Sequence, residues 1–498
     1  MEKLFNSTRD NNNNKLSPSK AIIKGLSDDG GLFVPEFLKD VKFNYKDFIG
    51  KSYNYIAKII LSEFLDFSKE QIDYCVDTAY SLNNFETEDI FKVVDVEDGL
   101  SILELFSGNT IAFKDCALSI LPLLLKCAKE NENDKDDVLI LTATSGDTGK
   151  AALEGFHDVD GIDVIVYYPY KGVSRLQLLQ MLTQKGSNVK SYAVKGNFDD
   201  TQAGVKEIFN DSDFEKELEK YGVKLSSANS INIGRLLPQV VYYYHSYVRL
   251  IEQGKIKEGD KVNFIVPTGN FGNILAGYYA YLTGLPVNKL ICASNDNNVL
   301  FDFFKSGVYD KNREFKKTIS PSMDILISSN LERLIYHMYD GDDKKVKDLM
   351  TKLNNEGKYT IDSKYMSKAD NFIGGYSTEN EIRKVIKKVY EEDDYLMDTH
   401  TAAGYKVYKD TKENDDTYSV LLSTASPYKF SKDVYDSIFE DDVKASDDVE
   451  YMYKLNEKTN VNIPKPVNNI ESFERREEEV ITKEDMRNSI LKYIEGKK

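Results

Sequence analysis

Hydrophobic positions along the chain follow two alternating patterns, short continuous runs and helically spaced stretches. From Ile102 onward, apolar runs of strand length recur, bounded by glycine or polar residues. Such runs suit strands that are buried on both faces, and their alternation with helical spacing predicts parallel sheets in an α/β architecture. The runs that we predict to be strands are residues 138–142, 164–168, 189–194, 261–266, 290–294 and 419–423.

The same patterning divides the chain into three parts. Residues 1–95 show mainly helical spacing and predict a helix-rich N-terminal domain. Residues 96–430 contain the predicted strands and should form two open, mostly parallel sheets flanked by helices. Within this region we expect a smaller subdomain at about 135–225 and a charged helical insert at about 305–400. Residues 431–498, acidic and then basic, are predicted to be a C-terminal extension.

The composition excludes some classes of partner. The chain has 498 residues, with 65 Lys and Arg against 82 Asp and Glu, and a net charge of −17. An acidic surface repels phosphate backbones and no basic patch offsets it, so we predict no nucleic-acid partner. The longest apolar run, residues 118–125, is too short to span a bilayer, so we expect no membrane partner.

The N-terminus and the cysteines indicate the cellular compartment. Residues 1–10 contain no apolar signal-peptide core. The four cysteines lie far apart without CxxC spacing, which is typical of reduced thiols, and we therefore predict a cytoplasmic protein. The four histidines are widely separated, so no metal site is predicted.

One lysine, Lys114, stands just before the apolar run at 118–125 and follows Ala112 and Phe113. Burial disfavours the charged form of an amine, lowers its pKa and leaves it free to attack a carbonyl carbon. The alternative is a lysine at a helix start whose stem packs while its ammonium group stays in water. This stretch alone favours the second interpretation, and the motifs that follow reverse the preference.

Residues 268–273, Thr-Gly-Asn-Phe-Gly-Asn, join a predicted strand to a helix of small residues. Glycines let backbone N–H groups approach an anion, and the helix N-terminus adds about half a positive charge. We therefore expect a phosphate held by backbone groups. The P-loop and dinucleotide patterns are both absent here, and a tight turn without a ligand is the alternative.

A second turn of this kind is Thr-Ser-Gly-Asp-Thr-Gly at residues 144–149, which offers hydroxyls and amides to a carboxylate or phosphate. Asp147 would repel an anion, so we expect it to contact a hydroxyl; the alternative is that Ser145 or Asp147 caps the helix. Ser-Thr-Ala-Ser at 423–426 either faces a ring nitrogen or simply ends a strand. His400 either orients a ligand or is structural.

In this order, the motifs resemble the threonine synthase family, pyridoxal-phosphate (PLP) enzymes of fold type II with a tryptophan-synthase β-like architecture. The resemblance is to the longer bacterial and fungal branch, and it covers most of residues 7–430. The matching stretches are residues 7–9, 29–32, 104–118, 144–149, 196–200, 229–232, 266–279, 320–330, 398–404 and 424–430.

The resemblance implies that O-phospho-L-homoserine and water become L-threonine and phosphate, with PLP as cofactor and Lys114 as the catalytic residue that forms the Schiff base. It places Asp147 near the cofactor 3-hydroxyl and Thr424 opposite the pyridine nitrogen. The implied ligands of the cofactor phosphate are Gly269, Asn270, Phe271, Gly272 and Asn273. Those of the substrate carboxylate are Thr144, Ser145, Gly146 and Thr148, and candidates for the substrate phosphate are Asn197, Asn232 and Arg235.

The chain departs from the family pattern around the expected site. Residues 107–110 read Ser-Gly-Asn-Thr in place of His-Gly-Pro-Thr, Cys116 replaces a phenylalanine and Ser426 a histidine. These changes bear on substrate choice, so two alternatives stay open. One is a PLP-dependent phospholyase or serine/threonine dehydratase that yields a 2-keto acid. The other is a non-catalytic phosphometabolite-binding protein with Lys114 at its surface. We expect a monomer or homodimer.

Overall fold

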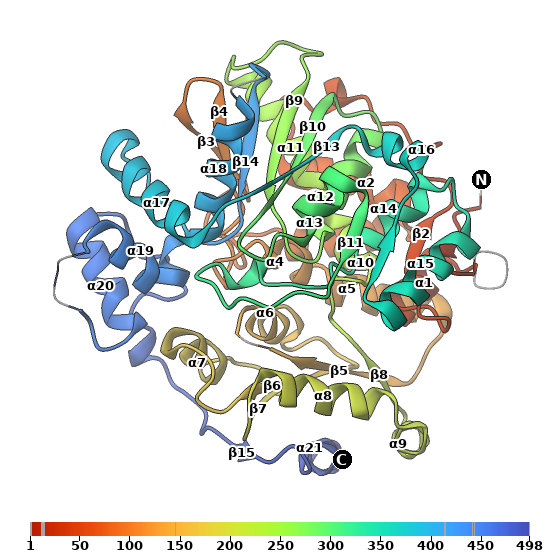
Figure 1. Cartoon of the computed structure of the whole chain (residues 1–498). Helices are drawn as coiled ribbons and strands as arrows, with labels where there is room; N and C mark the ends of the chain where they lie inside the picture. Colours follow the sequence, from red (N-terminus) through yellow and green to blue (C-terminus); the bar gives the residue numbers. More distant parts are fainter. Residues whose placement is uncertain are drawn as a thin grey trace.

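Two open sheets organise the structure, a computed structural model that describes residues 2–10, 15–144, 146–412, 415–440, 442 and 444–497 (Figure 1). The order in the larger sheet is β13 (Phe372–Tyr376), β10 (Val287–Ser294), β9 (Val262–Pro267), β14 (Ser419–Ser423), β4 (Leu100–Glu104) and β3 (Lys92–Glu97). The order in the smaller sheet is β15 (Val480–Ile481), β7 (Val189–Val194), β6 (Ile162–Pro169), β5 (Asp137–Ala143) and β8 (Val223–Ser226). Only β3 runs antiparallel to its neighbour in these two sheets, so the predicted fold class is confirmed.

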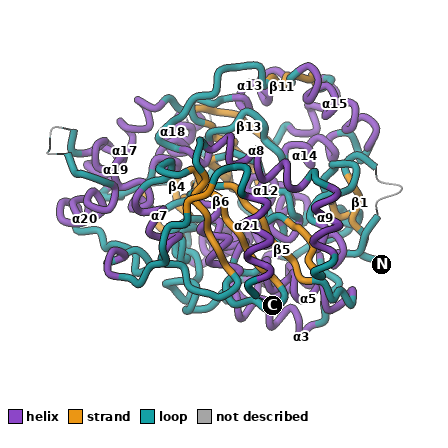
Figure 2. The backbone as a smooth tube through the Cα atoms, turned by 90° about the horizontal axis from the view of Figure 1, so that it is seen from below, coloured by secondary structure: helices purple, strands orange, loops and turns teal. Residues whose placement is uncertain are grey.

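Helices cover both faces of the smaller sheet, as parallel strands require. On one face, Leu139 and Leu141 of β5 pack in a cluster with Val205 and Ile490. On the other face, Ile140 packs with residues of α6. The helices around this sheet are α6 (Asp147–Phe156), α7 (Arg175–Leu182), α8 (Phe198–Phe209), α9 (Ser212–Glu219) and α21 (Met486–Glu495), and Figure 2 shows α21 close to α8.

Helix α6 lies against the smaller sheet and also packs on α4 (Lys114–Leu118), the short helix that follows β4. The approach is so close that a Cβ at Gly155 of α6 would overlap the carbonyl oxygen of Leu118. Each helix follows the carboxyl end of a strand, where open α/β sheets bind their ligands. The two helices therefore begin side by side, with Lys114 at the start of one and Asp147 at the start of the other.

The N-terminal part is helix-rich and packs on helices of residues 96–430. It comprises β1 (Phe5–Ser7), α1 (Pro18–Lys24), β2 (Phe33–Pro35), η1 (Tyr45–Phe48), α2 (Tyr53–Phe64) and α3 (Lys69–Ala79). Helices α1 and α3 contact α5 (Leu121–Glu132), and η1 and α2 contact α11 (Pro238–Glu252). Arg9 donates to both carboxylate oxygens of Glu332, at 2.9 and 2.7 Å. The stretch at residues 7–9, which matches the family pattern, therefore ties the N-terminal part to the rest of the chain. Strand β3 spans the predicted boundary at residue 95 and belongs to the larger sheet.

The segment at about 305–400, predicted to be a helical insert, contains three strands besides its helices. Strand β13 pairs with β10 at the edge of the larger sheet. Its Gly374 and Gly375 weaken the strand pattern in the sequence, which explains why it escaped prediction. The other elements are β11 (Val308–Asp310), η2 (Pro321–Met323), α14 (Leu331–Met338), α15 (Asp343–Glu356), β12 (Lys358–Thr360), α16 (Ser363–Met366), η3 (Ser367–Ala369) and α17 (Glu379–Asp393).

The remaining elements surround the larger sheet or follow it. They are α10 (Ile233–Leu236), α12 (Gly272–Leu282), α13 (Val299–Ser306), α18 (Thr399–Lys412), η4 (Pro427–Phe430), α19 (Ser431–Ile438), α20 (Asp448–Thr459) and η5 (Ile470–Ser472). Within the described ranges, no helix has the length and apolarity needed to cross a membrane. The four cysteines are buried and form no disulfide.

Candidate functional site

Lys114 lies at the start of α4 with its amine inside the protein. Its side chain is 14% exposed, and its Nζ lies 3.7 Å from Oδ2 of Asp147. Burial lowers the pKa of Lys114; the Asp147 carboxylate opposes this effect, whereas the positive charges of Lys429 and Arg235 act with it. The amine does not stay in water, so the interpretation as a solvated surface lysine is wrong. An amine in this setting is a suitable nucleophile and proton acceptor.

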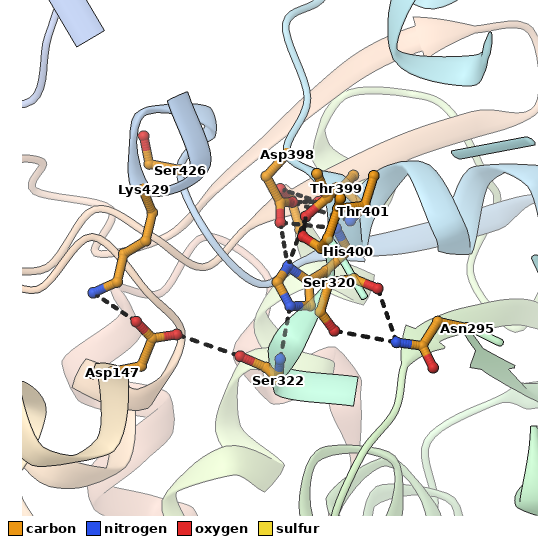
Figure 3. Close-up of polar contacts among 12 residues, drawn as sticks. Asp147, Asn295, Ser320, Ser322, Asp398, Thr399, His400, Thr401, Ser426 and Lys429 are labelled. Atoms are coloured by element: carbon orange, nitrogen blue, oxygen red, sulfur yellow. Dashed lines mark hydrogen bonds and ion pairs between the residues drawn. The ribbon is translucent and has the colours of Figure 1, made fainter. Parts of the chain in front are cut away.

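Asp147 is the first residue of α6, and Figure 3 shows its carboxylate between Lys429 and Ser322. Its Oδ1 accepts a hydrogen bond from Gln177 Nε2 at 3.1 Å and lies 3.2 Å from Lys429 Nζ. Its Oδ2 accepts from Ser322 Oγ at 3.3 Å and faces Lys114. Burial alone would raise the pKa of Asp147, but the charges of Lys429 and Lys114 hold it well below its usual range. The carboxylate is therefore ionised.

The turn that precedes α6 is held together by Thr144. Its Oγ1 accepts hydrogen bonds from the backbone N–H groups of Gly146 and Gly149, at 2.9 and 3.0 Å. Gly146 has φ +141°, and a Cβ there would overlap the side chain of Gln177. Thr148 is partly exposed, whereas Ser145 lies outside the described residues. The turn therefore offers the hydroxyl of Thr148 and the start of a helix to an anion.

The turn between β9 and α12 has the close packing that its glycines predict. A Cβ at Gly269 would overlap the carbonyl oxygen of Ser322. Phe271 adopts φ +63°, an uncommon conformation, and its buried ring stacks on Phe304 and Phe372. The ring anchors the turn, and α12 begins directly after it at Gly272, so its free N–H groups form a site for an anion.

Asn273 has a side chain of fixed orientation with one unused donor. Its Oδ1 accepts hydrogen bonds from the hydroxyls of Tyr242 and Tyr243, at 2.7 and 2.9 Å. Its Nδ2 is buried and has no hydrogen-bond partner in the protein. An unpaired buried donor is costly, so this amide is suited to an external acceptor such as a phosphate oxygen.

A second set of residues, which the sequence analysis missed, supports this turn from the other side. Asn330 Nδ2 donates to the carbonyl of Asn270 at 3.0 Å, and Ser328 Oγ donates to that of Gly269 at 2.7 Å. Arg333, fully buried, donates to Oδ1 of Asn330. These contacts fix the peptide carbonyls of the turn away from the α12 N-terminus.

Thr424 lies beside Phe113, the residue before Lys114, because β14 ends next to the segment before α4. The backbone N–H of Phe113 donates to the carbonyl of Thr424 at 2.9 Å. His400 approaches from α18: its Nδ1 lies 2.7 Å from Asp398, and its Nε2 accepts from the backbone N–H of Ser322 at 3.1 Å (Figure 3). His400 therefore holds the segment that contacts Asp147, a structural role.

The three candidates for the substrate phosphate differ in their surroundings. Asn197 is exposed and caps α8, and both polar atoms of the Asn232 side chain are used, by Ile22 and Gly234. Arg235 is buried, with one bond from Nη1 to the carbonyl of Ala228 at 2.6 Å, and its Nε has no partner. Burial lowers the pKa of Arg235 to about 10, and no carboxylate of the described residues forms an ion pair with it. Arg235 is therefore available to an external anion.

Three family models match the chain. The one described as "Threonine synthase N terminus" matches residues 4–80, "Pyridoxal-phosphate dependent enzyme" matches residues 103–362, and "Threonine synthase, C-terminal" matches residues 401–485. The middle match alone covers more than half of the sequence. The chain belongs to the threonine synthase family.

Relatives and solved structures of this family agree with the assignment. The chain is 37% identical to threonine synthase of Schizosaccharomyces pombe, over 86% of this chain and 88% of that protein. It is 41% identical to human threonine synthase-like 1 over 82% of this chain, but spans only 56% of the human protein. The crystal structure of yeast threonine synthase superposes with a TM-score of 0.88 at 31% identity, covering 99% of both chains. The crystal structure of PLP-bound threonine synthase from Brucella melitensis superposes with a TM-score of 0.85 at 34% identity, also covering 99% of both chains.

The residues present fit PLP, the cofactor of the threonine synthase family. Lys114 offers a buried amine to an aldehyde, and the turn at Gly269 offers a helix N-terminus to a phosphate. The unpaired Nδ2 of Asn273 supplies a donor that is free to bind a ligand. Within the described residues, no group of His, Cys, Asp and Glu side chains could hold a metal ion.

We expect the substitution Asn273→Asp to weaken PLP binding at least tenfold, which corresponds to about 1.4 kcal/mol. Aspartate retains an acceptor for Tyr242 and Tyr243 but loses the free donor and repels a phosphate. The measurement is a titration of cofactor-free protein with PLP, followed by visible absorption. Asn371→Asp is the matched control, because the Asn371 Nδ2 is also buried and unpaired, yet lies outside the turn. Equal affinity of Asn273→Asp and the wild type would contradict the assignment.

Proposed function

We propose that the protein is a threonine synthase, which converts O-phospho-L-homoserine and water to L-threonine and phosphate. The observation that carries the proposal is the buried Arg235 guanidinium, unpaired at Nε and close enough to Lys114 to lower the pKa of its amine. A buried cation without a carboxylate partner is costly unless a ligand neutralises it. A substrate that carries a phosphate near the carbons that Lys114 deprotonates would do so.

Lys114 is proposed to carry the proton transfers. PLP, when bound, supplies an electron sink that stabilises negative charge on the adjacent substrate carbon. Lys114 Nζ takes the proton from Cα of the substrate, releases it to water, and then takes a second proton from Cβ; its lowered pKa favours the free amine that both steps require. The ammonium group formed at Nζ then faces the ionised Asp147, which stabilises it.

The remaining residues are proposed to bind and orient. Arg235 binds the substrate phosphate and stabilises it as it leaves from Cγ, with Asn197 and Asn232 as further candidates. The start of α6, with the side chains of Thr148 and Thr144, binds the substrate carboxylate. Within the same turn, Ser145 and Gly146 stay predicted carboxylate ligands.

Two side chains are proposed to set the charge around the cofactor ring. Asp147 would lie near the 3-hydroxyl of the bound cofactor, and Thr424 would oppose the pyridine nitrogen with a neutral hydroxyl. A hydroxyl favours protonation of that nitrogen less than an aspartate would, which moderates electron withdrawal. The proposed phosphate ligands are residues of the turn, namely Gly269, Asn270, Phe271, Gly272 and Asn273.

Product analysis tests the function. We expect the protein, supplied with PLP and O-phosphohomoserine, to release threonine and phosphate in equal amounts. Release of phosphate with 2-ketobutyrate would favour the phospholyase or dehydratase alternative. Absence of both products and of a visible absorption band with PLP would favour the binding protein. A cytoplasmic location and a monomeric or homodimeric state stay predictions, which cell fractionation and light scattering can test.

A further inference from the structure

Lys429 is a buried lysine that the mechanism above does not use. It lies in η4, the first helical turn after β14, and its side chain is fully buried. Its Nζ donates to the carbonyl of Thr110 at 2.8 Å and lies 3.2 Å from Oδ1 of Asp147 (Figure 3). A buried ammonium group is costly unless it is paired. Asp147 is the carboxylate that pairs with it.

The Asp147 carboxylate thus lies between two ammonium groups, one on each oxygen. Lys114 faces Oδ2 at 3.7 Å and Lys429 faces Oδ1 at 3.2 Å. These two cations differ in one respect. Lys114 must be uncharged before it can act as a base, whereas Lys429 is held by Thr110 and Asp147 and takes no part in that exchange.

The other groups that face Asp147 cannot replace this charge. Gln177 of α7 and Ser322 of η2 are uncharged donors. His400 of α18 acts on Asp147 only from a distance, because its Nδ1 faces Asp398 and its Nε2 accepts a hydrogen bond from the Ser322 backbone. Among the described residues, Lys429 is therefore the one cation that stays beside Asp147 while Lys114 is neutral.

Asp115 follows Lys114 in the sequence and is a buried carboxylate with no cation of the described residues bonded to it. Its pKa shows the effect of burial on a carboxylate in this part of the protein. It accepts hydrogen bonds from the Thr110 backbone N–H at 2.8 Å and from the Thr110 hydroxyl at 2.5 Å. Burial nevertheless raises the pKa of Asp115 to about 6. Asp147 is also buried, so it should behave similarly once its ammonium partners are removed.

We propose that Lys429 is a positioning residue that keeps Asp147 ionised and in place while Lys114 is uncharged. The cofactor atom closest to Asp147 then meets a fixed negative charge throughout the reaction. This inference rests on the proposed function only in placing the cofactor at Lys114; it does not depend on which product is released.

Spectroscopic titration of the PLP-loaded protein tests the proposal. The variants are Lys429→Met, Lys429→Arg and the double variant Lys429→Met with Asp147→Asn. We expect Lys429→Met to show a new pH-dependent change in the visible band, with a midpoint between about pH 5 and 8, the range of buried carboxylates. Lys429→Arg should lack this change because it keeps the charge. The double variant should lack it because no carboxylate remains at position 147.

Each outcome of this experiment either supports or overturns the proposal. A Lys429→Met spectrum that follows the wild-type pH profile, with a folded protein by circular dichroism, overturns the proposal. If Lys429→Met fails to fold or to bind PLP, recovery in the double variant supports the pair. If both variants fail equally, Lys429 acts through its hydrogen bond to Thr110 and not through Asp147, and the proposal is overturned. A wild-type protein with a visible band but no threonine product would refute the proposed function and leave this test intact.

Discussion

Replacing Lys114 with alanine should abolish threonine formation, with a loss of at least about 10³-fold in rate. The substitution removes both the group that holds the aldehyde and the base that moves the protons. Lys429, the other lysine beside Asp147, cannot take over, because its amine is held by the Thr110 carbonyl and the Asp147 carboxylate. The measurements are the rate of threonine release and the mass of the Lys114 peptide after borohydride reduction with PLP.

The matched control for this prediction is Lys135→Ala, which removes an exposed lysine. It should keep both wild-type activity and the modified peptide at Lys114. Wild-type turnover by Lys114→Ala, or borohydride labelling at a different lysine, is a result that our assignment could not accommodate.

Replacing Arg235 with methionine should lower kcat/KM for O-phosphohomoserine by about 10² to 10³-fold. A charge-assisted bond between a buried guanidinium and a phosphate is worth several kcal/mol, and each 1.4 kcal/mol is a factor of ten. Methionine fills similar space without the charge. PLP affinity should change little, because the turn at Gly269 and Asn273 holds the cofactor phosphate. Steady-state kinetics and a PLP titration measure the two effects separately.

Two further substitutions sharpen this test. Arg235→Lys should recover only part of the loss, because a lysine keeps the charge but not the paired donors. Arg313→Met removes a partly exposed ion pair with Asp302 and should leave the kinetics unchanged. If Arg235→Met lost PLP affinity and kept its KM, Arg235 would have to be reassigned from substrate to cofactor.

The sequence predicted most of the fold because buried parallel strands leave a continuous apolar run. Residues 189–194 and 419–423 coincide with β7 and β14. Strand β8 was missed because Val-Lys-Leu-Ser is short and half polar. Strand β13 was missed because its glycines contribute no apolar side chain. Both segments form strands because neighbouring strands pair with them. Pairing between distant segments cannot be predicted from the local sequence pattern.

The residues of the site likewise fall into those that the sequence predicted and those that it missed. Lys114 and the turn at Gly269 belong to compact motifs, in which spacing along the chain and function coincide. Lys429 and Arg333 act on residues far away in the sequence: Lys429 meets Asp147 across the two sheets, and Arg333 supports the turn through Asn330. A lone lysine after a strand and a lone arginine in a charged helix resemble ordinary surface residues until the fold buries them.

The two-residue strand β15 has a consequence for how the protein is made. It pairs with β7 and completes the smaller sheet, whose other strands end at Ser226. About 250 residues separate β8 from β15, which corresponds to roughly 10 to 50 s of synthesis at ribosomal speed. Throughout that interval the backbone groups of β7 lack their partner strand, and such open edges invite pairing with other chains. The growing polypeptide should therefore depend on chaperones most strongly between the emergence of β7 and that of β15.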